Sequence, residues 1–143
     1  MTAVRPALKL NHAAALRVLD AAVEAAAKMG VPQCIAIVDE GCNLLAFVRM
    51  DGSRVLSVDS ATRKAMTAAT TGQPSSQLAP EKAPLLAQAT NGRMTGLPGG
   101  LPLIFEGHIV GGIGVGSGTS EQDVEVAQAA ISVFAAMTES TGQ

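Results

Sequence analysis

Aromatic residues are scarce in this chain of 143 residues, which has no tryptophan, no tyrosine and only three phenylalanines. So few rings leave little for unpaired bases to stack on, and a site for single-stranded nucleic acid is therefore not expected. The ten basic and twelve acidic residues give a formal net charge of −2 and form no basic block. The sequence thus argues against nucleic acid as a partner.

Long apolar runs and paired cysteines are missing too. No stretch approaches the roughly 20 apolar residues that cross a bilayer, and the first residues lack the pattern of a secretion signal. Cys34 and Cys42 do not have zinc-site spacing, and no second pair completes such a site. We therefore expect a cytoplasmic protein with no membrane contact and no disulfide bond.

Hydrophobic residues make up 48% of the chain, and most of them are small and aliphatic. This content and the length of the chain predict one folded domain over 1–143. Two predicted hairpins, around Glu40-Gly41 and Gly107-His108, imply a largely antiparallel sheet flanked by helices. The expected class is α/β in the broad sense, more strictly α+β, in the order α-β-β-α-(α)-β-β-α. The predicted elements are helices over 11–28, 58–71, 85–90 and 121–138, and strands over 33–38, 44–50, 101–106 and 109–115.

The first hairpin and the last helix carry specific expectations. A turn at Glu40-Gly41 places Cys34 opposite Phe47. Ser120 is expected to cap the last helix, with Asp123 as the acid of a capping box.

His12 is the most interesting of the two histidines. Helical spacing places it on one row with Leu16 and Leu19, which predicts an inward-facing imidazole at the start of the first helix. The helix dipole there disfavours the charged ring, and a neutral imidazole can ligate iron or accept a proton. It can equally be a residue that merely belongs to the helix start, so both interpretations stay open. His108 falls in a tight turn and is expected at the surface.

Glycines alternate along the last predicted strand. Gly112, Gly114 and Gly116 share one face, which therefore carries no side chains. Glycine within a strand often marks the close approach of a ligand or another backbone. Either a helix packs tightly on this bare face or the face is the floor of a ligand pocket. No nucleotide-binding glycine pattern is present.

Polar side chains lie where the first hairpin meets the next helix. Lys64 and Thr67 belong to a polar stripe beside an alanine face, and the simplest interpretation is a solvated side. Alternatively, Lys64 joins Arg49 in a small cationic site. Arg49 and Asp51 lie two residues apart at a strand end, where they can orient an anion or form a weak local salt bridge.

Four segments of the chain carry recognisable motifs in a fixed order. They are D-E-G-C-N-L-L-A-F-V-R-M-D-G at 39–52, K-A-M-T-A at 64–68, G-G-L-P-L at 99–103, and G-G-I-G-V-G-S-G at 111–118 followed by E-Q-D at 121–123. These segments resemble the GlcG/HbpS-like family, although the usual V-S-G reads V-G-S-G here. The resemblance implies a profilin-like α+β domain that assembles into homo-oligomers. It also implies haem binding in some members through a histidine near the first helix, a place comparable to that of His12.

Small-molecule binding is the first function expected. The ligand would be haem, with His12 as the metal ligand, or an anionic catabolic metabolite, and the scarcity of rings weakens the case for haem. The remaining candidate ligand-binding residues are Thr67, Gly99, Gly100, Gly114 and Gly116.

A small catabolic enzyme is the alternative, either an isomerase, a lyase or a hydrolase, acting on a carboxylate-bearing ring-cleavage product or a 2-oxo acid. Arg49 and Lys64 would hold the carboxylate, and Asp51 or His12 would move a proton. Backbone N–H groups of the glycine-rich strand and of the Gly99-Gly100 turn would stabilise a developing oxyanion.

Overall fold

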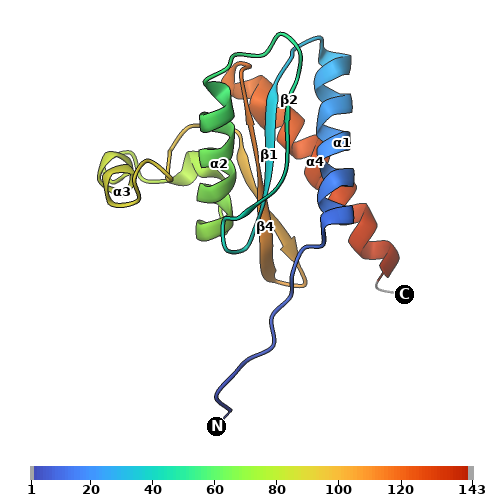
Figure 1. The fold of residues 1–143 in the computed structure, drawn as a ribbon, viewed down its shortest axis with the longest axis vertical. Coiled ribbons are helices and arrows are strands. Elements are labelled where there is room, and N and C mark those ends of the chain that lie inside the picture. Colours follow the sequence, from blue (N-terminus) through green and yellow to red (C-terminus); the bar gives the residue numbers. More distant parts are fainter. Residues whose placement is uncertain (1, 142–143) are drawn as a thin grey trace.

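A four-stranded antiparallel sheet with the strand order β2-β1-β4-β3 forms the middle layer of the protein (Figure 1). The computed structural model describes residues 2–141. This architecture confirms the expected α+β class and the order of its elements. The elements are α1 (His12–Met29), β1 (Cys34–Asp39), β2 (Leu44–Arg49), α2 (Ser57–Thr71), the 3-10 turn η1 (Ser75–Gln77), α3 (Ala83–Ala89), β3 (Gly100–Phe105), β4 (His108–Gly116) and α4 (Ser120–Thr141).

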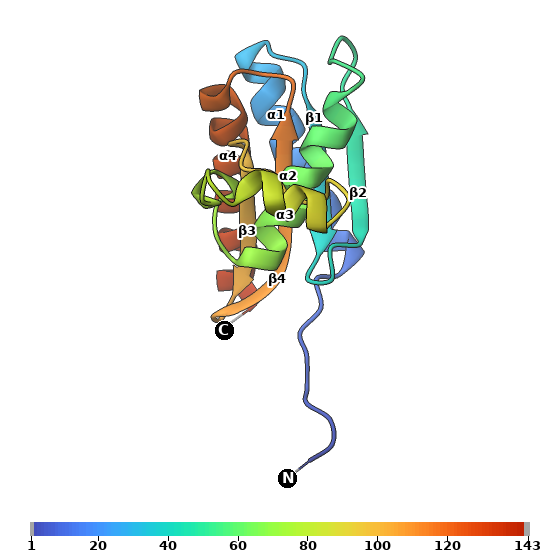
Figure 2. The ribbon, with the colours of Figure 1, turned by 90° about the vertical axis from the view of Figure 1, so that its left-hand side faces the viewer.

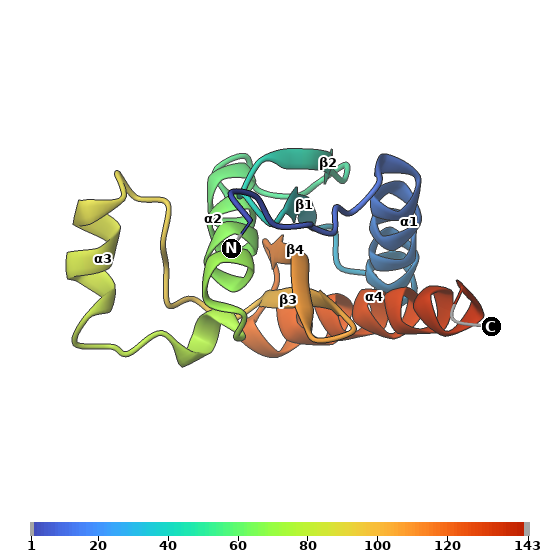
Figure 3. The ribbon, with the colours of Figure 1, turned by 90° about the horizontal axis from the view of Figure 1, so that it is seen from below.

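Helices cover both faces of the sheet. Helix α2 lies on one face, and α1 and α4 lie together on the other (Figures 1 and 3). Every residue of β1 is buried, as expected for a central strand. Its side chains alternate between the layers: Ala36 and Val38 pack beneath α2, while Ile37 joins the core beneath α1 and α4. Among residues 2–141, no helix has the length and apolar character needed to cross a membrane.

Helix α1 begins and ends as predicted but turns a different side inward. The Asn11 side chain accepts the Ala14 N–H at 2.7 Å, and Gly30, with φ of 74°, ends the helix. His12 and Leu16 are exposed, so the predicted inward row is wrong for these two residues, whereas Leu19 of the same row is buried. Alanines form most of the buried side, and the larger residues therefore did not identify it. The buried residues are Ala15, Val18, Leu19, Ala22 and Ala26.

The turn between β1 and β2 is longer than predicted, and this changes the pairing. The Asp39 N–H donates to the Asn43 carbonyl at 2.9 Å, and the Asp39 carboxylate accepts the Asn43 N–H at 2.9 Å. Burial works to raise the pKa of Asp39, but hydrogen bonds from Asn43 and Gly41 outweigh it and lower that pKa. Cys34 consequently pairs with Arg49 and not with Phe47, so the predicted register is wrong by two residues.

The bare glycine face of β4 lies directly against α2. A Cβ atom at Gly114 would stand 1.9 Å from the Ala61 carbonyl oxygen, and one at Gly112 would stand 2.4 Å from that of Ala65. Both distances are far below van der Waals contact. The glycines therefore let a helix backbone lie on the strand, which is the first of the two alternatives drawn from the sequence.

We expect Gly114→Ala to lower the free energy of unfolding by about 3 kcal/mol, because the added methyl group has no room beside Ala61. Urea unfolding followed by circular dichroism measures the change. Gly96→Ala is the control, since its added methyl group would lie 3.7 Å from the nearest atom and should change stability by less than about 0.5 kcal/mol. Equal stability of the two variants would contradict the close packing of α2 on β4.

Candidate functional site

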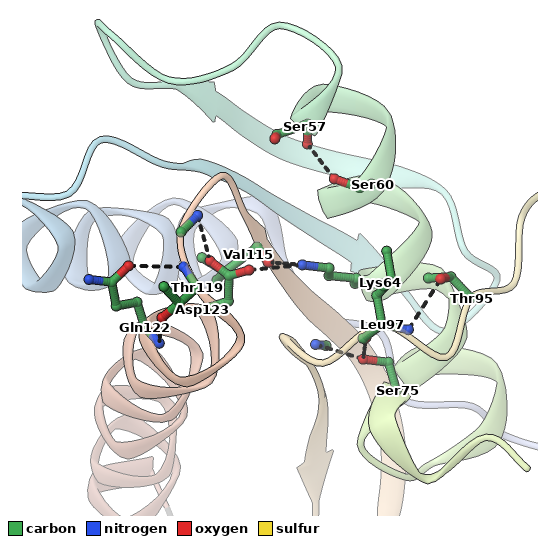
Figure 4. Close-up of polar contacts among 12 residues, drawn as sticks. Ser57, Ser60, Lys64, Ser75, Thr95, Leu97, Val115, Thr119, Gln122 and Asp123 are labelled. Atoms are coloured by element: carbon green, nitrogen blue, oxygen red, sulfur yellow. Dashed lines mark hydrogen bonds and ion pairs between the residues drawn. The ribbon is translucent and has the colours of Figure 1, made fainter. Parts of the chain in front are cut away.

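A buried ion pair joins the helices on the two sides of the sheet (Figure 4). Lys64 Nζ, from α2, lies 3.0 Å from Asp123 Oδ2 in the first turn of α4 and donates to the Val115 carbonyl at 2.8 Å. Both charged side chains are only 5% exposed. The solvated stripe expected on α2 is therefore wrong for Lys64 and also for Thr67, which is fully buried.

The start of α4 differs from the prediction by one residue, and this frees Asp123 for the ion pair. Thr119 and Gln122 form the capping box, with the Gln122 side chain accepting the Thr119 N–H at 2.9 Å and the Thr119 hydroxyl accepting the Gln122 N–H at 3.2 Å. Asp123 instead points inward and accepts the Gly118 N–H at 3.0 Å. Burial raises the pKa of Asp123, and its contact with Lys64 offsets part of that rise.

Gly99 makes room for the Lys64 side chain, and Gly100 makes room for the backbone of α2. A Cβ at Gly99 would stand 3.2 Å from Lys64 Cδ, and one at Gly100 would stand 2.3 Å from the Lys64 carbonyl oxygen. The Gly100 N–H, expected to stabilise an oxyanion, already donates to the Ser75 hydroxyl at 2.9 Å. Thr67 is likewise engaged: its hydroxyl accepts a backbone N–H from residue 95 at 3.0 Å and donates to the carbonyl of residue 63 at 2.8 Å.

Arg49 and Asp51 lie away from this ion pair. Arg49 is exposed at the end of β2, while Lys64 reaches toward the junction of β4 and β3, and Figure 2 shows β2 and β3 at opposite edges of the sheet. Asp51 falls in a turn after β2 has ended, so the strand geometry expected for the pair is absent at that point. The structure thus does not assemble the predicted cationic site.

Two hollows lie near the start of α1 and share Leu8 in their walls. The first, here called the α1–α4 cavity, has a volume of about 230 Å³ and is lined by Leu8, Lys9, Leu10, Asn11, Ala14, Phe105, Val110, Phe134, Met137 and Thr138. The second, here called the N-terminal groove, has a volume of about 790 Å³. It is lined by Arg5, Pro6, Ala7, Leu8, Glu40, Ala69, Thr70, Glu106, Gly107, His108 and Ile109. Two of the three phenylalanines of the chain are thus gathered at one cavity.

His12 is exposed and directly follows Asn11, which lines the α1–α4 cavity. His108 is also exposed, as expected, and lines the N-terminal groove. Both histidines of the chain therefore belong to this end of the molecule, here called the histidine end. No motif marked it in the sequence, because its walls come from an extended N-terminal segment, a strand turn and the far part of α4.

Two more hollows lie elsewhere. A groove of about 630 Å³ runs along α4 beside Pro98, with Val124 and Ala129 in its wall. A cavity of about 180 Å³, here called the sulfur cavity, lies between the β1–β2 turn, α2 and the segment after α3. None of the four hollows described is lined by a site residue predicted from the sequence. Within residues 2–141, no three His, Cys, Asp or Glu side chains gather as a metal site.

The sheet with α2 on one face and α1 and α4 on the other, and hollows at its ends and edges, defines a small α+β domain of the DUF336 and HbpS class. The chain belongs to the HbpS-like family: the family model described as "Haem degrading protein HbpS-like" matches residues 10–132.

Solved structures with this fold include the ORFY protein of Klebsiella pneumoniae, with a TM-score of 0.90 and 31% identity over 95% of this chain and 97% of that one. HbpS of Streptomyces reticuli, solved as a double mutant, has a TM-score of 0.82 and 36% identity over 91% of this chain and 90% of HbpS. A PduOC:haem complex has a TM-score of 0.80 and 29% identity over 87% of this chain and 94% of that chain. The corrinoid adenosyltransferase PduO of Citrobacter freundii is 30% identical over 134 residues, which are 90% of this chain and 40% of PduO, so the chain spans about two-fifths of that relative.

We expect Lys64→Met to lower the free energy of unfolding by about 3 kcal/mol or more, because it leaves the Asp123 carboxylate buried without its partner. Asp123→Leu should have a similar effect through the unpaired ammonium group. The double variant should be more stable than the sum of the two single losses predicts, since it buries no charge.

Urea unfolding of the four proteins completes the cycle. Lys28→Met is the control, because Lys28 makes an exposed pair with Glu24 and its loss should cost less than about 1 kcal/mol. Additive losses in the cycle would show that Lys64 and Asp123 do not depend on each other.

Proposed function

We propose that this protein binds haem at the histidine end, with His12 as the ligand to iron. The observation that carries the proposal is an exposed His12 beside the apolar α1–α4 cavity. Membership of the HbpS-like family and similarity to a PduOC structure described as a haem complex support it.

The residues at this end suit the chemistry of haem. A porphyrin plane needs apolar contact, which Phe105, Phe134 and Met137 supply. Its propionates need cations, and Arg5 lines the adjoining groove, whereas Lys9, which lines the cavity, is already paired with Glu40. The cavity alone is smaller than most pockets for cofactors, so the neighbouring surface has to complete the contact.

The chain's own residues would each have a distinct task. Asn11 fixes the start of α1 by accepting the Ala14 N–H and so holds the position of the adjacent His12 backbone. The phenylalanines shield one side from water, and the exposed imidazole of His12 is free to turn toward a ligand. Haem, when bound, supplies an iron centre whose properties follow its axial ligand and the polarity around it.

An anionic metabolite is the second ligand class drawn from the sequence. Lys64 is committed to Asp123 and Arg49 lines none of the hollows described, so these two residues do not support it. The enzyme alternative is unsupported for the same reason: none of the hollows described is lined by Arg49, Asp51 or Lys64.

Titration of the purified protein with hemin should produce a Soret band whose position indicates histidine ligation, saturating at one equivalent. His12→Ala should weaken binding at least about tenfold, because it removes the axial ligand. Absorbance titration and resonance Raman spectra measure both effects.

His108→Ala is the matched control and should retain the wild-type spectrum, because the proposed axial ligand His12 remains in place. Phe134→Leu should weaken binding without changing the axial ligand, since it alters only the apolar wall. A wild-type spectrum and affinity in His12→Ala would contradict the assignment.

We also propose that copies of this chain assemble through the segment 73–98, here called the α3 arm. The seven-residue helix α3 has no buried residue and stands off from α2 (Figure 3). A helix this short is unstable in water by itself, and Leu85 is 65% exposed. The groove along α4 has acidic residues Glu121 and Glu125 in its wall, whereas the arm carries two basic residues, Lys82 and Arg93, and one acidic residue, Glu81. This complementarity suits an arm of one copy lying in the groove of another.

Two free cysteines are consistent with a reducing compartment, so we also infer a cytoplasmic location.

We expect Leu85→Ser to shift the protein toward monomer, because it removes the apolar anchor of the arm. Light scattering coupled to size exclusion measures the mass over a range of concentrations. Leu16→Ser is the control: Leu16 is 49% exposed on α1 and should not affect assembly. A wild-type mass in Leu85→Ser would contradict assembly through the arm.

A further inference from the structure

Sulfur side chains gather at one small cavity on the side of the sheet that α2 covers. Cys42 comes from the β1–β2 turn, Met66 from α2, and Met94 from the arm. The other lining residues are Gly41, Thr70, Thr90 and Arg93. Three segments that are distant in sequence thus each contribute a sulfur-containing residue to the wall of one cavity.

This gathering is more than the composition of the chain provides. The chain has two cysteines and six methionines among 143 residues, whereas three of the seven residues that line this cavity carry sulfur. All three are partly buried, and Cys42 and Met66 also pack against the core beneath α2. An open space lined by sulfur is therefore a specific feature of this location.

Cys42 packs against the core beneath α2, a role that does not need its thiol. It is a free thiol, and the other cysteine, Cys34, lies at the opposite end of β1 with its sulfur near Ser53. The Cys42 thiol donates only a 3.4 Å contact to the Met66 carbonyl. A packing role would be served by several residues of similar size.

The backbone at Cys42 is also unfavourable for cysteine. Its φ of 65° lies in the left-handed region, where glycine or asparagine is accommodated at lower cost. A side chain with a hydrogen-bonding or metal-binding sulfur is thus held at a position that its own backbone disfavours, a condition common at functional sites.

The chemistry of the walls distinguishes among metals. Thiolate and thioether ligands prefer soft ions, above all Cu(I), and no carboxylate or imidazole lines the cavity to favour zinc, magnesium or calcium. Arg93 adds a positive charge at the wall, which repels a divalent ion more than a monovalent one.

We propose that the sulfur cavity binds one soft monovalent cation, Cu(I), through the Cys42 thiolate and the thioethers of Met66 and Met94. The bound cation replaces the thiol proton, so the Cys42 sulfur and the cation together carry no net charge. Because Met94 belongs to the arm and Met66 to α2, the cation also ties the arm to the body of the protein. This site is separate from the histidine end and does not depend on haem binding.

Competition with a chromophoric Cu(I) chelator, under anaerobic conditions, tests the proposal on the full chain. We expect one equivalent of Cu(I) to be withheld from the chelator. Cys42→Ser should abolish this binding, and Met66→Leu and Met94→Leu should each weaken it about tenfold, because leucine keeps the volume but removes the sulfur.

The controls separate a built site from simple thiol chemistry. Cys34→Ala and Met29→Leu remove sulfur elsewhere and should bind Cu(I) as the wild type does, as should His12→Ala. With methyl-labelled methionine, Ag(I) as a stable analogue should shift the NMR signals of Met66 and Met94 and leave that of Met29 unchanged.

Three results would overturn the proposal. The first is a wild-type protein that yields all its Cu(I) to the chelator. The second is unchanged binding in both methionine variants, which would mean a thiol acting alone. The third is binding that disappears in Cys34→Ala but persists in Cys42→Ser.

Discussion

The buried contact between Lys64 and Asp123 constrains more of this structure than any other single interaction. The Lys64 side chain is only 5% exposed, and a buried ammonium group is stable only when it is paired. Its partners are the Val115 carbonyl and the Asp123 carboxylate. To reach them the lysine chain leaves α2 and passes Gly99, where a side chain would obstruct it. The start of β3, the end of β4 and the first turn of α4 are thereby set relative to one another. The glycines of β4 let α2 lie close to the strand, so the Lys64 side chain can reach the Val115 carbonyl and the Asp123 carboxylate.

The sequence predicted the elements well because their signals are local. Asn11 and Gly30 bound α1 by capping rules, and the alternation of glycines along β4 pointed to a close approach. The pairing of β1 with β2 was missed because the register depends on side-chain hydrogen bonds of Asp39 within the turn, which periodicity does not contain. The inward side of α1 was missed because alanine, not leucine, forms most of it.

The candidate site was harder to predict for a physical reason. Lys64 has the sequence spacing of a solvated residue, and only its partner, more than fifty positions away, makes it an interior one. Asp123 was assigned to a cap that Gln122 forms instead. Cavity walls come from the N-terminal segment, the arm and the far turns of α4, where no motif is found. Family resemblance supplied the likeness to haem-binding proteins, which composition alone argued against.

The arm has a consequence for how the protein can change over time. Since α3 contributes no buried residue, substitutions and insertions within Ala83–Ala89 leave the sheet and its covering helices intact, whereas Ser75, elsewhere in the arm, is buried and accepts the Gly100 N–H. Selection on the core is therefore uncoupled from selection on α3. Relatives can keep one interior and acquire different partners or assemblies through this segment alone.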